Sequence, residues 1–258
     1  MASVYTTEIA SDSVASDNPI HQRLLKAYVL AVEYIQGDLL EVGCGEGRGI
    51  DWLLPKITHY SAIDKIASVI EQLQLRYPQG KFYSGNIPPL KAFADNSFDC
   101  LVSFQVIEHI QDDRLFLKEI HRVLKPGGLA LLTTPNRPMS LSRNPWHIRE
   151  YTSVELTQLA KEFFKDVEMK GITGNEKVMR YYERNKLAVN KTMRWDIFDL
   201  QYKLPASILR IPYEILNRLN RNKLKEQADD LVTSIKHEDY LLVDQAETAL
   251  DLFLTVRK

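Results

Sequence analysis

The chain has 258 residues, 45% of them hydrophobic and 26% charged, with a formal net charge of −1 at pH 7. This length suits one large α/β domain or a domain with an insertion. The near-neutral charge provides no general attraction to nucleic acid, so a nucleic-acid partner is not expected. Two cysteines make no disulfide framework, and no apolar run reaches the roughly 18 residues of a membrane span.

Residues 1–18 are expected to form a flexible leader, because they lack the basic and apolar regions of a secretory signal, and a cytoplasmic location is therefore favoured. Apolar residues at helical spacing then predict a helix over 20–35. Beyond it, strands and helices alternate. Strands are predicted at 39–42, 60–63, 81–84, 98–104, 129–134, 166–172 and 249–256, and helices at 47–54, 66–77, 112–124 and 152–164.

This alternation predicts an α/β fold with a Rossmann-like, seven-stranded, mostly parallel sheet and helices on both faces. Residues 19–174 and 247–258 would form that domain. Residues 175–246 break the alternation and are expected to be a mainly helical insertion before the last strand, serving as a lid or substrate region.

The insertion is basic, with 13 Lys/Arg against 8 Asp/Glu over residues 175–236. A helix over 206–224 gathers Ile208, Ile211, Ile215 and Leu219 on one face. Such a helix most simply covers a core. It could also close over an acceptor pocket or contact a membrane surface.

The most informative segment is Leu39–Gly49, LLEVGCGEGRG. An apolar strand runs into glycines at every second position, which lets the backbone bend sharply and approach a ligand. Dinucleotide sites use G-x-G-x-x-G instead. The spacing E-x-G-x-G-x-G therefore disfavours, without excluding, an NAD(P)-dependent oxidoreductase.

This segment resembles motif I of the class I S-adenosylmethionine-dependent methyltransferases, and the resemblance extends over about residues 18–174 and the final strand. It is strongest to the small-molecule type, the group like the methyltransferases of ubiquinone and menaquinone biosynthesis. In that family the acidic residue and the glycine backbone surround the methionine and ribose of the cofactor. The implied contacts here are Glu41, Gly43, Cys44, Gly45 and Gly47.

The same resemblance implies further cofactor contacts at the ends of later strands. Asp64, followed by Lys65, would bind the ribose hydroxyls, although an aspartate there could simply cap the next helix. Asn86 and Ile87 would contact the adenine. The implied contacts near the methyl group are Phe104 and Gln105, and Arg23 could reach the cofactor carboxylate.

Glu108-His109 follows these residues. Some O-methyltransferases hold magnesium with E-x-x-E-H, but Gln105 replaces the first glutamate here, and an amide is a poor ligand for that cation. No metal is therefore expected. His109 suits a general base. The alternative is that the pair only orients its loop. His147 is the alternative base, and Trp146, Arg149 and Tyr151 beside it are expected to face the substrate.

The sequence therefore predicts transfer of a methyl group from S-adenosylmethionine, with S-adenosylhomocysteine as product, to a small-molecule or lipid-like, amphiphilic acceptor. O-methylation is favoured. Besides the oxidoreductase, the alternative is a protein that binds S-adenosylmethionine without turnover. The residues leave open both the acceptor and the oligomeric state.

Overall fold

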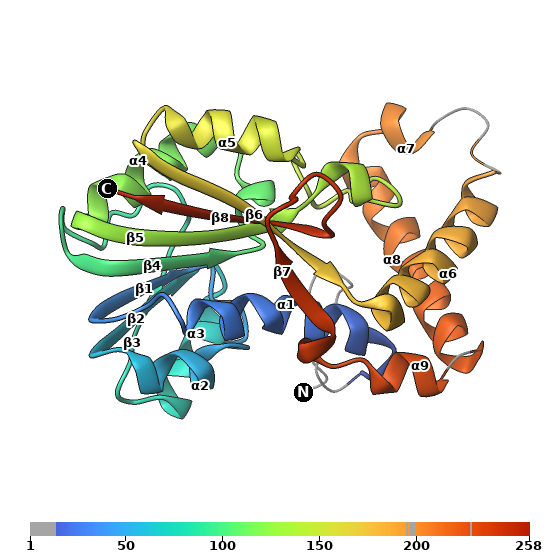
Figure 1. Cartoon of the computed structure of the whole chain (residues 1–258), viewed down its shortest axis with the longest axis horizontal. Helices are drawn as coiled ribbons and strands as arrows, with labels where there is room; N and C mark the ends of the chain where they lie inside the picture. Colours follow the sequence, from blue (N-terminus) through green and yellow to red (C-terminus); the bar gives the residue numbers. More distant parts are fainter. Residues whose placement is uncertain (1–13, 195, 197–199, 228) are drawn as a thin grey trace.

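The computed structural model describes residues 14–194, 196, 200–227 and 229–258. Its centre is an eight-stranded sheet with the strand order β3-β2-β1-β4-β5-β8-β6-β7 (Figure 1). Strands β1 to β5 pair in parallel, whereas β8 runs antiparallel to both of its neighbours, β5 and β6. The strands are β1 Asp38–Val42, β2 His59–Asp64, β3 Lys81–Ser84, β4 Phe98–Phe104, β5 Leu124–Pro135, β6 Asp166–Gly174, β7 Tyr240–Val243 and β8 Asp251–Arg257.

The predicted α/β fold and mostly parallel sheet are confirmed, but the predicted number of seven strands is wrong. The eighth strand, β7, lies inside the segment expected to be mainly helical, and it pairs antiparallel with β6 at the edge of the sheet. It has only four residues, YLLV. An apolar run this short has no periodicity that distinguishes a strand from a loop or a helix end.

Helices cover both faces of the sheet. On one face, Tyr28, Leu53 and Ile70 belong to a single buried cluster and come from α1 (Asn18–Ala31), α2 (Ile50–Leu53) and α3 (Ala67–Arg76). On the other face, Phe116 and Leu156 come from α4 (Asp113–Val123) and α5 (Ser153–Lys161). Short 3-10 helices are η1 Ala15–Asp17, η2 Leu54–Lys56, η3 Ile107–His109, η4 Arg137–Met139 and η5 His237–Asp239.

The remaining helices are α6 (Glu176–Met193), α7 (Leu200–Lys203), α8 (Ala206–Gln227) and α9 (Asp229–Ser234). Figure 1 shows them at the end of the molecule toward which the parallel strands run, opposite the end of β8. They therefore lie at the carboxyl edge of the sheet, where ligands bind in open α/β folds. Helix α8 continues through Pro212.

Part of the expected leader is fixed in place. Asp17 of η1 is fully buried, and one of its carboxylate oxygens accepts hydrogen bonds from Arg218 at 2.8 Å and Arg221 at 3.1 Å, both on α8. Val14 flanks η1, residues 15–17 form η1, and Asn18 starts α1. These residues are therefore not a flexible leader. The rest of that prediction, residues 1–13, lies outside the described residues.

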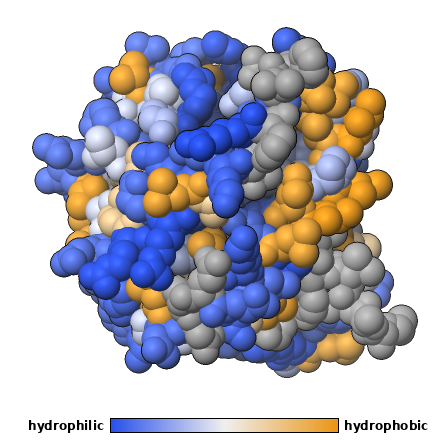
Figure 2. Space-filling model, turned by 90° about the vertical axis from the view of Figure 1, so that its right-hand side faces the viewer, coloured by the Kyte–Doolittle hydropathy of each residue, from blue (hydrophilic) through white to orange (hydrophobic). Residues whose placement is uncertain are grey.

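The apolar side of α8 does not cover a core. Arg221 and Leu224 are buried on the side of the helix that faces the protein. Figure 2 views this end of the molecule, where hydrophobic side chains reach the surface among hydrophilic ones. The exposed members on α8 are Ile208, Ile211, Ile215, Leu216 and Leu219. In the described part of the chain, no helix is both long and apolar enough to cross a membrane.

Candidate cofactor and acceptor site

The loop after β1 is built on glycines with left-handed backbone. Gly43, Gly45 and Gly47 have φ of +81°, +49° and +78°, which side-chain-bearing residues rarely adopt. A Cβ at Gly43 would lie 2.4 Å from a methyl carbon of Val106, so the loop packs closely against the segment after β4. A Cβ at Gly45 would meet nothing within 4 Å. The backbone is therefore open to a ligand at Gly45.

Asp64, at the end of β2, holds this loop. The Gly45 N–H donates to its Oδ2 at 2.9 Å, and the Ile66 N–H donates to its Oδ1 at 3.0 Å. The residue is only 8% exposed. Each carboxylate oxygen keeps a further lone pair for a ligand hydroxyl. The carboxylate thus supports the start of α3 and also lies at the open side of the glycine loop.

Glu41 lies beneath the loop between two tyrosines. The Tyr28 hydroxyl donates to Oε1 at 2.7 Å, and the Tyr60 hydroxyl donates to Oε2. Burial raises the pKa of Glu41 to about 7, although the hydrogen bonds from both tyrosines oppose the shift. Its predicted cofactor contact stays a prediction, because both oxygens already bind protein groups. Cys44 is buried nearby, which raises the pKa of its thiol.

The end of β4 reaches the same edge of the sheet. Phe104 is buried, and its ring packs edge-on against Tyr28 with centroids 4.9 Å apart. Gln105 has a φ of +58°, which is uncommon for a residue with a side chain. Its Nε2 donates to the Thr133 hydroxyl at 3.3 Å, and its backbone N–H donates to the Thr133 carbonyl at 2.9 Å. These bonds hold the chain in this conformation.

Lys65, Asn86 and Ile87 also follow strand ends. Lys65 and Asn86 are exposed, whereas Ile87 is half-buried and packs against the hydrophobic cluster on the α4 and α5 face. Since β2 and β3 are adjacent parallel strands, the segments that follow them lie at one edge. Their predicted adenine and ribose contacts remain predictions.

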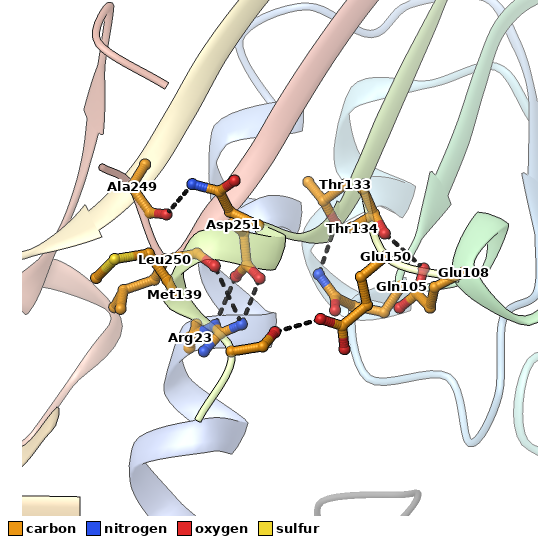
Figure 3. Close-up of polar contacts among 12 residues, drawn as sticks. Arg23, Gln105, Glu108, Thr133, Thr134, Met139, Glu150, Ala249, Leu250 and Asp251 are labelled. Atoms are coloured by element: carbon orange, nitrogen blue, oxygen red, sulfur yellow. Dashed lines mark hydrogen bonds and ion pairs between the residues drawn. The ribbon is translucent and has the colours of Figure 1, made fainter. Parts of the chain in front are cut away.

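Arg23 has a protein partner in place of the predicted cofactor carboxylate. Its Nε donates to Asp251 Oδ2 at 2.6 Å, and its Nη2 donates to Asp251 Oδ1 (Figure 3). Asp251 is 1% exposed and lies at the start of β8. Sequence reasoning missed this pair. The available signal was Asp251, an aspartate at the start of an otherwise apolar strand. Contact of Arg23 with the cofactor stays a prediction.

His109 is neutral, and within the described part of the chain one of its two ring nitrogens hydrogen-bonds. Its Nδ1 lies 2.9 Å from the Trp146 carbonyl oxygen, which can only accept, so Nδ1 carries the proton and Nε2 keeps its lone pair. Burial, together with the nearby His147, lowers the pKa of His109 to about 4. An imidazole in this state can accept a proton or a hydrogen bond at Nε2.

His147 comes from the loop after β5 and lies beside His109, with the two rings edge-to-face and centroids 5.0 Å apart. Its Nδ1 is 2.6 Å from Glu150 Oε1, and its Nε2 is 2.8 Å from Asn144 Nδ2. Burial alone would raise the pKa of Glu150, but hydrogen bonds from His147 and Ser140 lower it. The structure thus brings together the two predicted bases, and Glu150 was not predicted.

Glu108 completes this cluster. It is 1% exposed, accepts a hydrogen bond from the Thr134 hydroxyl at 3.0 Å, and has its pKa raised to about 7 by burial (Figure 3). One ligand atom from each of Glu108, His109 and His147 lies within 4.8 Å of the others. Because Asn144 and Glu150 already engage both nitrogens of His147, these contacts describe a hydrogen-bonded cluster.

The other residues expected to face a substrate anchor their loop. Arg149 Nη1 and the Tyr151 hydroxyl both donate to Asp113 Oδ2 on α4, at 2.5 and 2.8 Å. The Arg210 guanidinium of α8 stacks over the Trp146 ring, 4.0 Å from its centroid. The loop is therefore held between α4 and α8, and the predicted substrate contacts of Trp146, Arg149 and Tyr151 stay predictions.

Comparison with known proteins agrees with this geometry. Residues 40–132 match the model of a methyltransferase domain. A protein of Mycolicibacterium smegmatis named a "probable S-adenosylmethionine-dependent methyltransferase" is 40% identical over 136 residues, covering 51% of this chain and 52% of that protein. A similarly named protein of Mycobacterium tuberculosis is 39% identical over 141 residues, covering 52% and 51%. The chain thus spans about half the length of the curated relatives it matches.

Solved structures show the same fold. A SAM-dependent methyltransferase from Thermotoga maritima superposes with a TM-score of 0.58 at 14% identity, covering 93% of this chain and 91% of that one. One from Archaeoglobus fulgidus has a TM-score of 0.52 at 15% identity, covering 93% of each chain. With the sheet order and the glycine loop, these matches support the predicted resemblance to the class I S-adenosylmethionine-dependent methyltransferases.

Proposed function

We propose that this chain transfers a methyl group from S-adenosylmethionine to a hydroxyl oxygen of a small or amphiphilic acceptor. The observation that carries the proposal is one edge of the sheet. The open Gly45 backbone and the Asp64 carboxylate lie at the carboxyl edge of the parallel strands. The segments that lead to His109 and His147 start from the same edge. Gly45 and Asp64 suit the binding of an uncharged diol. His109 and His147 suit proton transfer.

The residues present fit the cofactor. The backbone beside Gly45 is free of other atoms, and Asp64 keeps lone pairs for two ribose hydroxyls. We assign the adenine end to Asn86 and Ile87, and the methyl end to Phe104 and Gln105. Bound there, S-adenosylmethionine supplies a methyl group on a positively charged sulfur.

The histidine pair then acts on the acceptor. His109 presents the Nε2 lone pair, which would accept the hydroxyl proton of the acceptor, while the bound cofactor would supply the methyl group. Glu150 and Asn144 fix the ring of His147 beside it. Holding the acceptor oxygen in line with the methyl carbon supplies most of the rate, and base catalysis adds to it.

The insertion acts as a lid over this pair. Its helices contact the loop after β5 at three points: the Tyr182 hydroxyl donates to the Met139 carbonyl at 3.0 Å, Arg143 donates to the Gln201 carbonyl at 2.7 Å, and Arg210 stacks on Trp146. These contacts support the proposal that the helical part of residues 175–246 closes over the acceptor, whereas β7 within that segment joins the sheet of the main domain.

The test begins with binding of S-adenosylmethionine, S-adenosylhomocysteine and NAD by calorimetry. Binding of NAD alone would make the chain an oxidoreductase. Transfer of radiolabelled methyl to fractions of a cell extract then reports turnover and the acceptor, and cofactor binding with no labelled fraction would indicate a protein without turnover. His109→Ala should lower methyl transfer by about a hundredfold or more but keep cofactor binding, whereas His59→Ala, on a side chain 74% exposed, should change neither.

A further inference from the structure

The exposed apolar side of α8 is unusual for a soluble surface. The described residues include 13 large hydrophobic side chains that are exposed, and eight of them lie between positions 187 and 219, within the insertion. Exposed hydrophobic residues are ordinarily scattered singly, and their clustering marks an interaction surface. The eight are Leu187, Leu200, Tyr202, Ile208, Ile211, Ile215, Leu216 and Leu219.

Five of these residues form a stripe on α8, and we call it the α8 stripe: Ile208, Ile211, Ile215, Leu216 and Leu219. They recur at intervals of three and four residues, which places them on one face of the helix. Their exposed fractions run from 51% to 70%. The stripe faces away from the protein, since Arg221 and Leu224 on the other side of α8 are buried.

The charges around the stripe are basic. Helix α8 carries five Lys/Arg against two Asp/Glu over residues 206–227, with Arg218 and Arg221 paired to Asp17, although the chain as a whole has a net charge of −1. Lys223 follows Leu219 by one helical turn and is exposed on the same side. An apolar face bordered by basic residues is the pattern of helices that lie in the interface of an anionic bilayer.

The area of the stripe distinguishes a bilayer from a second copy of the chain. The stripe consists of five partly exposed aliphatic side chains on one helix, whereas a stable protein interface buries about 800 Å² and about 20–30 residues on each partner. Shallow insertion into lipid headgroups needs no such minimum, because every aliphatic side chain that leaves water adds to the binding.

We propose that the α8 stripe inserts into the surface of an anionic lipid bilayer. The same helix reaches the candidate site, because Arg210 stacks on Trp146, whose carbonyl binds His109. An amphiphilic acceptor lying in the bilayer would thus meet the site at its lid. This last step rests on the proposed function, whereas the lipid contact is independent of it.

The test is sedimentation with vesicles of phosphatidylcholine alone or with 30% phosphatidylglycerol, without cofactor. We expect binding to the anionic vesicles, weakened by salt, and at least tenfold weaker binding for Ile211→Asp with Ile215→Asp. Lys223→Glu should weaken binding to anionic vesicles. The matched control is Leu75→Asp on α3, since Leu75 is 84% exposed but lies outside the stripe, and it should bind like the parent.

Three outcomes would overturn the proposal: no binding to either vesicle, equal binding by the stripe variant and the parent, or a dimer in analytical ultracentrifugation that the stripe variant dissolves. Circular dichroism confirms that each variant is folded. Because the assay uses no cofactor, its failure would leave methyl transfer untouched, and loss of methyl transfer would leave lipid binding in place.

Discussion

The guanidinium of Arg23 on α1 donates two hydrogen bonds to the buried carboxylate of Asp251 on β8, which is 228 residues away in sequence. It thereby fastens the first helix to the last strand. Removing one member of a buried ion pair leaves the other charge without compensation, at a cost of about 3–5 kcal/mol.

Arg23→Leu should therefore lower the free energy of unfolding in urea by about 3 kcal/mol. Arg23→Leu with Asp251→Leu should recover most of it, because no unpaired charge remains. Lys170→Ala removes a solvent-accessible pair with Glu168 and should lower the free energy of unfolding far less. An Arg23→Leu variant as stable as the parent would contradict the pairing of Arg23 with Asp251. If Arg23 held only the cofactor, the stability without cofactor would not change.

Gly45 and Gly127 offer a matched pair for the cofactor site. Both have positive φ, and a Cβ at either would meet nothing within 4 Å. Each Gly→Ala change should thus cost a similar 1–2 kcal/mol or so of backbone strain. Only Gly45→Ala should weaken S-adenosylmethionine binding in calorimetry, by tenfold or more, because the added methyl fills the open side of the loop. Equal affinities in the two variants would place the cofactor elsewhere.

Asp64 is tested against another aspartate that supports a helix start. Asp64 accepts from the Ile66 N–H before α3, and Asp112 accepts from the Leu115 N–H at the start of α4. Asp64→Asn and Asp112→Asn should both lower the melting temperature slightly. We expect only Asp64→Asn to weaken cofactor binding, by about tenfold, since a diol bond to a carboxylate is worth about 1.5–3 kcal/mol. If Asp64→Asn bound the cofactor with unchanged affinity, the role of Asp64 would be only to support the start of α3.

Glu41 should make stability depend on pH. Burial raises its pKa to about 7, so the folded state binds a proton that the unfolded state releases near pH 4.5. The resulting stabilisation is fully present below pH 4.5 and is lost as the pH rises through about 7. Glu41→Gln cannot titrate, so its stability relative to the parent should rise from pH 5 to pH 8. Urea titrations at both pH values measure this, and a pH-independent difference would refute it.

The sequence predicted the parallel half of the sheet well, because its central strands β1, β4 and β5 contain apolar runs and amphipathic helices lie between the strands. β7 escaped prediction since YLLV carries no period, and its pairing with β6 depends on tertiary contact. The apolar face of α8 was interpreted as core-covering because periodicity reports that a face is apolar and not what lies against it.

At the site, sequence spacing located the segments but not the partners of the side chains. Spacing placed Asp64 and the glycines at strand ends, where the structure joins them through the Gly45 N–H. The partners of Arg23 and of Arg149, which are Asp251 and Asp113, are distant in sequence. Only folding brings them within reach, so one sequence could not reveal that these arginines are already paired.

The position of β8 has a consequence for how the chain acquires its structure. β8 fills the slot between β5 and β6, and the Lys258 backbone bonds to Gly127 and Gly128 in the turn that begins the straight part of β5. Until residues 251–257 emerge from the ribosome, β5 and β6 are two open edges with no partner between them. We expect a nascent chain that pauses before residues 251–257 to expose the unpaired edges of β5 and β6. Such edges bind chaperones and promote edge-to-edge aggregation.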